Sequence, residues 1–208
     1  HFREHKDAKF VTQEMADAFS TLYLGGAADV LPPVTAIALY DEFRELTPPG
    51  EKGEEMVRKL ADRLVAVDLL DRAGKLLEEQ IEFRLKGTDK ARVGAQLALI
   101  RIMANEPGQA LTALEDSNSP GLPEDLLTKR RHLRARALMD QAKSDVALQL
   151  LQHDESIDAQ RLRAEIFWDA QDWPRAAQVF GHLIRSDGVR PQSDLSEKQA
   201  LSVLNYAI

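Results

Sequence analysis

The sequence predicts an all-α fold, a right-handed superhelix of stacked antiparallel helix pairs. Apolar residues recur at helical spacing along most of the chain, and alternating β-branched runs are missing. Glycine and proline cluster between these periodic segments, where helices are expected to end. Four segments also place a small residue at the centre of an apolar helical stripe, which indicates that one helical unit is repeated.

Residues 1–50 are predicted to form a first helical hairpin. Apolar side chains from Phe10 to Leu22 follow helical spacing until a Gly-Gly pair at 25–26, which is typical of a helix C-terminus. Pro32 and Pro33 open the next helix, which runs to Leu46 before residues 47–50 break it. We expect this hairpin to be a divergent or capping unit in front of a repeat array over residues 51–208.

Residues 51–208 are predicted to contain four further helix pairs and the beginning of another. The first helix of each pair is followed by a second after a short break. The expected pairs are 57–64 with 70–81, 91–104 with 107–114, 126–138 with 146–151, and 162–168 with 173–184. The segment 195–208 begins another helix that has no partner, so the last repeat is expected to be incomplete.

A small residue marks the centre of each second helix. These residues stand 37, 37 and 29 positions apart, scattered around a period of about 34, and are Ala73, Ala110, Ala147 and Ala176. Four residues later, one turn along the same face, each helix has a bulky apolar side chain: Leu77, Leu114, Leu151 or Phe180. A small side chain beside a large one lets two helices approach closely and fills the gap one turn away.

The chain resembles the tetratricopeptide repeat family over about residues 54–208, most clearly over 162–183. There the family's small, aromatic, aromatic, small and aromatic positions are matched by Ala164, Phe167, Trp173, Ala176 and Phe180. The earlier repeats are degenerate: Leu133 and Leu162 stand one residue early, and the prolines that close the family's repeats are lacking. The resemblance implies that the first helix of each pair lines a concave face, and Trp173 is expected in the core.

Composition limits the classes of function. The formal net charge of −7 argues against a nucleic-acid partner, and the absence of Cys excludes thiol catalysis, thiolate metal sites and disulfides. No stretch approaches the roughly 20 apolar residues of a membrane span. The chain begins at His1 and stops at Ile208 within an apolar helical pattern, so we expect both ends to be cut from a longer protein. The compartment stays open between cytosol and periplasm, with the cytoplasm favoured.

The predicted concave groove is basic with an apolar floor, as suits a peptide with acidic groups. Its candidate lining residues share helix faces and are Arg92, Leu99, Met103, Lys129, His132, Arg136, Met139, Arg161 and Trp168. Arg58, Asp62 and Glu165 are expected on the same face. Alternatively, the basic run Lys129, Arg130, Arg131, Arg134 and Arg136 is only a solvated helix face that balances nearby acidic residues.

We therefore expect a non-catalytic scaffold or adaptor that binds a peptide or partner helix, with no catalytic residue, cofactor or metal. His1 and His5 have the spacing of a helical metal pair but no evident third ligand. Three other classes stay open. The chain could self-associate through 195–208, regulate a larger bacterial envelope-associated or enzymatic protein, or carry a catalytic site of its own.

Overall fold

The structure is a computed structural model that describes residues 6–48, 50–186 and 194–207. These residues form α-helices and two short 3-10 helices, without a strand among them, so the all-α prediction is confirmed. The helices are α1 (Lys6–Leu24), α2 (Pro33–Phe43), α3 (Glu51–Ala66), α4 (Leu70–Phe83), α5 (Gly87–Met103), α6 (Pro107–Asp116), α7 (Glu124–Asp140), α8 (Ser144–Leu151), α9 (Ile157–Asp169), α10 (Trp173–Ser186) and α11 (Glu197–Ala207). The 3-10 helices are η2 (Ala27–Val30) and η3 (Arg44–Leu46).

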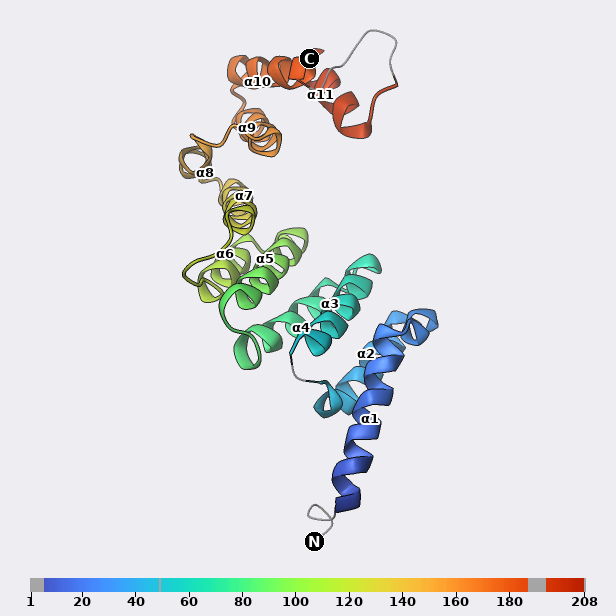
Figure 1. Ribbon diagram of the computed structural model, residues 1–208. Coiled ribbons are helices and arrows are strands. Elements are labelled where there is room, and N and C mark those ends of the chain that lie inside the picture. Colours follow the sequence, from blue (N-terminus) through green and yellow to red (C-terminus); the bar gives the residue numbers. More distant parts are fainter. Residues whose placement is uncertain (1–5, 49, 187–193, 208) are drawn as a thin grey trace.

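The helices pack in adjacent pairs and follow one another in an elongated row (Figure 1), with α1 and α11 near opposite ends. From α3 to α11, each helix contacts the next one along the chain, and α7 also packs against both α5 and α9. The accessible surface is 13061 Å². A compact monomer of this mass would expose about 9700 Å². The excess agrees with an extended row of helices.

One turn recurs in the four helix pairs α3–α4, α5–α6, α7–α8 and α9–α10. In each turn a residue adopts a left-handed backbone with φ between 57° and 61°, at Asp68, Asn105, Ala142 and Gln171. The N–H of the following residue donates to the carbonyl oxygen five residues back, over 2.8 to 2.9 Å, as in a Schellman C-cap. These left-handed residues stand 37, 37 and 29 positions apart, which is the spacing of the small residues in the sequence.

The small residues lie where the second helix of each pair packs most closely. Ala73, Ala110, Ala147 and Ala176 are at most 1% exposed, and the large residues four positions later are also buried. The hydrophobic core is divided into clusters along the row: one extends from α1 to α7, another joins α7, α8 and α9, and another joins α9 and α10. Each unit therefore buries its apolar face mainly against its neighbours, as in a repeat architecture.

The N-terminal helices join the same core by different contacts. Aromatic rings of α1 and α2 meet at Phe19, Tyr23 and Tyr40, and the Tyr23 hydroxyl donates a 2.6 Å hydrogen bond to the Ala36 carbonyl. Arg63 of α3 donates to the carbonyl oxygens of Ala28 and Leu31 over 2.7 and 2.5 Å. The guanidinium therefore ties α3 to the segment between α1 and α2.

Two residues correct the expectations from the sequence. Trp173 is 51% exposed and lies edge-on against Trp168, so it is not a core residue. Arg130, expected on a solvated face, is buried between α5, α6 and α7. Its guanidinium donates to the carbonyl oxygens of Ala91 and Leu114 and to the Ser117 hydroxyl, and burial lowers its pKa. These three acceptors make Arg130 a link between two helix pairs.

Candidate binding cleft

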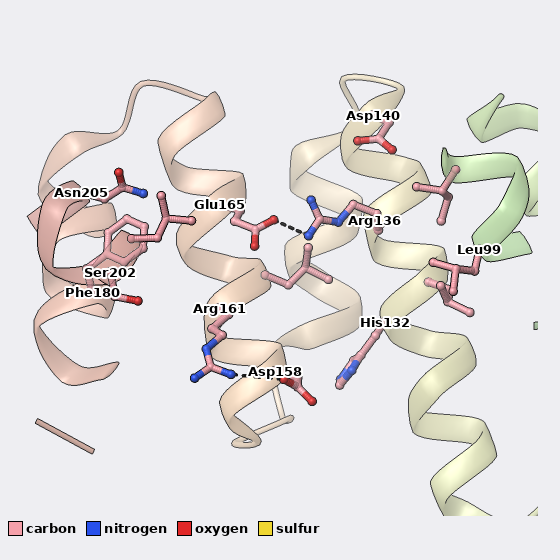
Figure 2. A pocket seen from close by; sticks show the side chains of 14 residues that line it. Leu99, His132, Arg136, Asp140, Asp158, Arg161, Glu165, Phe180, Ser202 and Asn205 are labelled. Atoms are coloured by element: carbon pink, nitrogen blue, oxygen red, sulfur yellow. Dashed lines mark ion pairs between the residues drawn. The ribbon is translucent and has the colours of Figure 1, made fainter. Parts of the chain in front are cut away.

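A cleft of about 670 Å³ lies where α5, α7, α9, α10 and α11 come together (Figure 2). Most of its lining comes from the first helices of successive pairs, and α11 supplies a wall on the other side of α9 from α7. The lining residues are Leu99, Ile102, His132, Leu133, Arg136, Asp140, Asp158, Arg161, Leu162, Glu165, Phe180, Leu201, Ser202 and Asn205.

The cleft offers an apolar surface that the fold leaves partly uncovered. Five helices contribute to it, through Leu99, Ile102, Leu133, Leu162, Phe180 and Leu201. Leu99 on α5 is 41% exposed and Leu201 on α11 is 58% exposed. Large apolar side chains in a concave site are the usual source of affinity for a bound partner. The two residues are therefore available to contact apolar side chains of a partner.

Ion pairs hold the basic side chains of the cleft. Arg136 of α7 pairs with Glu165 of the neighbouring helix α9, and Arg161 pairs with Asp158 one turn earlier over 3.6 Å (Figure 2). Asp140 makes no ion pair within the described part of the chain, and its pKa is raised by burial and then by the nearby Asp169, while Arg136 acts in the opposite direction. The lining is thus of mixed charge, which corrects the basic pocket expected from the sequence.

His132 is anchored at the edge of the cleft by a buried carboxylate. Its Nε2 lies 2.8 Å from Asp154 Oδ2, and the backbone N–H of Ser156 donates to Asp154 Oδ1 over 3.0 Å. Burial acts to raise the pKa of Asp154, but the hydrogen bonds from Ser156 and His132 outweigh it and lower that pKa to about 2. Arg131 adds an ion pair over 3.7 Å. Asp154 therefore fixes α7 to the connection between α8 and α9.

The structure brings together some of the residues that the sequence proposed for the groove and separates others. Those that line the cleft are Leu99, His132, Arg136, Arg161 and Glu165. Seven others lie outside it. Arg58 and Asp62 of α3 do not line it, and Asp62 accepts a 2.7 Å hydrogen bond from Gln96. Arg92 is exposed and pairs with Asp89, Met103 and Lys129 are exposed, Met139 packs on the core of α7 to α9, and Trp168 packs against Trp173 and Phe180.

Several lining residues were not found by reasoning from the sequence. Asp140 lies four residues after Arg136 and eight after His132, so the helical spacing contained a signal for it. Asp158 likewise lies three residues before Arg161. Leu201, Ser202 and Asn205 of α11 gave no such signal, because only the docking of α11 against α10 brings them to the cleft.

Metal-ion clusters and membrane-spanning helices are not found in the described part of the chain. No group of three or more His, Asp or Glu side chains there is arranged to hold a metal ion, and His1 and His5, whose spacing was noted in the sequence, lie outside the described residues. None of the described helices combines the length and apolar character required to cross a membrane.

Comparisons of the chain with protein-family models, curated proteins and solved structures found no match. The function is therefore inferred from the geometry of the cleft.

Proposed function

We propose that this chain is a non-catalytic, tetratricopeptide-like interaction module that binds a peptide segment or partner helix in the cleft between α5, α7, α9 and α11. The recurring turn and the close-packed alanines support a right-handed superhelix of repeated hairpins. In such an array the first helices line a concave face, and here α5, α7 and α9 supply most of the cleft. The observation that carries the proposal is this apolar cleft, with Leu99 and Leu201 exposed on different helices.

The form of the cleft favours a chain segment as the occupant. It extends across several helices instead of closing around a small molecule, and its polar groups lie among apolar side chains. Peptide-binding grooves combine a few apolar anchors with polar groups that set orientation. The ion pairs between Arg136 and Glu165 and between Arg161 and Asp158 hold those polar groups in place before a partner arrives.

Selection from a random library of displayed 12-residue peptides tests the proposal even though the natural partner is not identified. The informative variant is Leu201→Gln, which removes one apolar anchor from α11. Leu204→Gln is its matched control, because Leu204 lies on the same helix, is also 58% exposed and does not line the cleft.

We expect peptides enriched on the unmodified protein to bind Leu201→Gln about tenfold more weakly, as the loss of one apolar anchor implies. The same peptides should bind Leu204→Gln unchanged. If no enriched peptide distinguishes the two variants, the cleft is not the binding site and the proposal is wrong.

A second function, self-association, is favoured by the exposed apolar residues of α11. Leu201, Leu204 and Tyr206 are 58%, 58% and 52% exposed. A second copy that covered them would bury an apolar surface otherwise in water. Sedimentation equilibrium tests this alternative: a mass that rises with concentration and falls back to 23.3 kDa in Leu204→Gln would support it. A monomer at all concentrations would contradict it.

A further inference from the structure

The charge that is left uncompensated in the cleft is negative. Arg136 is paired with Glu165, Arg161 with Asp158, and His132 with Asp154. Among the described residues that line the cleft, Asp140 is the carboxylate that has no ion pair. A partner that brought a carboxylate to this place would meet a like charge at Asp140, and Glu165 and Asp158 already balance the charges of the two guanidinium groups. The expectation of an acidic partner is therefore not favoured by the geometry.

The position of Asp140 within its helix adds to this negative potential. Asp140 is the last residue of α7, and its neighbour Asp169 is the last residue of α9. The final carbonyl groups of a helix carry partial negative charge, so a carboxylate at that end is unfavourable and a cation is favourable. Here α7 and α9 pack side by side, and Asp169 is near enough to Asp140 to raise its pKa, so both carboxylates add negative potential near one end of the cleft.

The opposite end of the cleft differs. Figure 2 shows Asp140 at one end, whereas Asp158, Arg161 and His132 lie toward the other. The apolar residues Leu99, Leu133, Leu162 and Leu201 line the same cleft. The cleft therefore combines an apolar lining with one acidic end, a pattern that favours one direction for the occupant.

We propose that the occupant is a peptide segment that places large apolar side chains against Leu99 and Leu201 and a lysine or arginine beside Asp140. This inference rests on the proposed function, since it assigns the chemistry of the partner of that same cleft. The cation would gain a partner in Asp140 and would also reduce the repulsion between Asp140 and Asp169. The apolar contacts supply affinity, and the carboxylate supplies the choice between partners.

The test repeats the peptide selection on Asp140→Asn and on Asp116→Asn. Asp116 is the matched control, because it is also an exposed last residue of a helix, α6, and does not line the cleft. Both changes remove one charge from a helix C-terminus, so their effects on helix stability should be alike. Any difference in the selected peptides then reports on the cleft.

We expect the unmodified protein and Asp116→Asn to enrich peptides with more Lys and Arg than Asp and Glu, and Asp140→Asn to lose this preference. In a synthetic copy of one enriched peptide, changing the Lys or Arg to Gln should weaken binding to the unmodified protein about fivefold. It should leave binding to Asp140→Asn unchanged, so that the two changes are coupled.

Two failures are distinguishable. Peptides that depend on Leu201 but are acidic or neutral, or whose basic preference persists in Asp140→Asn, would overturn the charge assignment and leave the proposed function in place. If no peptide depends on Leu201, the proposed function falls together with this inference.

Discussion

Gly94 of α5 lies where α5 packs closely against the end of α6. A Cβ atom at this position would lie 1.8 Å from the Ser117 hydroxyl oxygen and 2.2 Å from its Cβ. That same hydroxyl accepts a 3.0 Å hydrogen bond from Arg130. Any side chain at position 94 would therefore push apart α5, the end of α6 and the guanidinium that links them to α7.

Gly94→Ala should lower the free energy of unfolding by about 2 kcal/mol, because overpacking outweighs the gain in helix propensity. The control Gly108→Ala should raise it by about 0.5 to 1 kcal/mol, since a Cβ there would meet nothing closer than an ordinary contact at 3.5 Å. Urea denaturation measures both. Adding Ser117→Gly to Gly94→Ala should recover part of the loss; a Gly94→Ala variant as stable as the original chain would refute this packing.

The Asp154 carboxylate makes the free energy of unfolding depend on pH. Its folded pKa of about 2 lies below the ordinary value of 3.8, so the carboxylate stabilises the fold at and above that ordinary value. This contribution, about 2 kcal/mol, is lost as the pH falls from about 4 towards 2. Asp154→Asn should therefore be less stable than the original chain at pH 7, with a gap that closes near pH 2.

Denaturation curves at pH 7, 4 and 2.5 measure that gap. The control Glu155→Gln removes a neighbouring exposed carboxylate and should change stability by less than about 0.5 kcal/mol at each pH. A difference between the original chain and Asp154→Asn that stays constant down to pH 2.5 would contradict the assigned role of the carboxylate.

At the scale of the element, the recurring turn shows which features of a helix pair can be predicted from the sequence and which cannot. The small residues after each turn carry a clear spacing, so the helix pairs could be predicted. The turn residues do not share a residue type: Asp68, Asn105, Ala142 and Gln171 adopt the same left-handed backbone. Only Asn and Asp favour that conformation, so the capping motif could not be identified from residue type.

Ala142→Gly should stabilise the chain by about 0.5 to 1 kcal/mol, because glycine adopts the left-handed conformation without strain from a Cβ atom. The control Ala18→Gly, at an exposed site inside α1, should instead cost about 0.5 to 1 kcal/mol through lost helix propensity. Thermal unfolding separates the two signs. Equal destabilisation by both variants would show that position 142 does not hold the turn.

Single helices also explain where the predictions about individual side chains were wrong. The basic run of α7 did not indicate that Arg130 points inward. A run of basic residues shows where charges lie in the sequence, but not which backbone carbonyl oxygens will accept hydrogen bonds from a guanidinium. Trp173 matches an aromatic family position, yet it begins α10, where its ring packs at a steep angle against Trp168 and stays half exposed. In both cases a neighbouring helix determines the environment of the side chain, and the spacing of residues within one helix holds no information about that neighbour.

For the whole molecule, the prediction that helices pack in pairs is confirmed, while the cleft could be predicted only in part. Helical spacing predicts which residues of α5, α7 and α9 share the face that lines the cleft. The wall from α11 and the pairing of Arg136 with Glu165 depend on how distant helices dock. The sequence therefore indicated which helices face the cleft, but not that carboxylates neutralise its arginines.

The extended arrangement has a consequence in solution. A compact chain of 208 residues would have a radius of gyration of about 17 Å. Small-angle X-ray scattering should give a clearly larger value, because each helix pair contacts mainly its neighbours along the row. Sedimentation of the same sample controls for self-association. A monomer with the compact value would contradict the elongated row.

Photo-crosslinking tests the central claim, peptide binding in the cleft, most directly. A photoreactive amino acid replaces Leu99, which lines the cleft, or Leu127, which is equally exposed at 41% but lies outside it. With a peptide enriched by the selection, we expect irradiation to yield a peptide adduct at position 99 and none at position 127. Adducts at both positions alike, or at 127 alone, would contradict binding in the cleft.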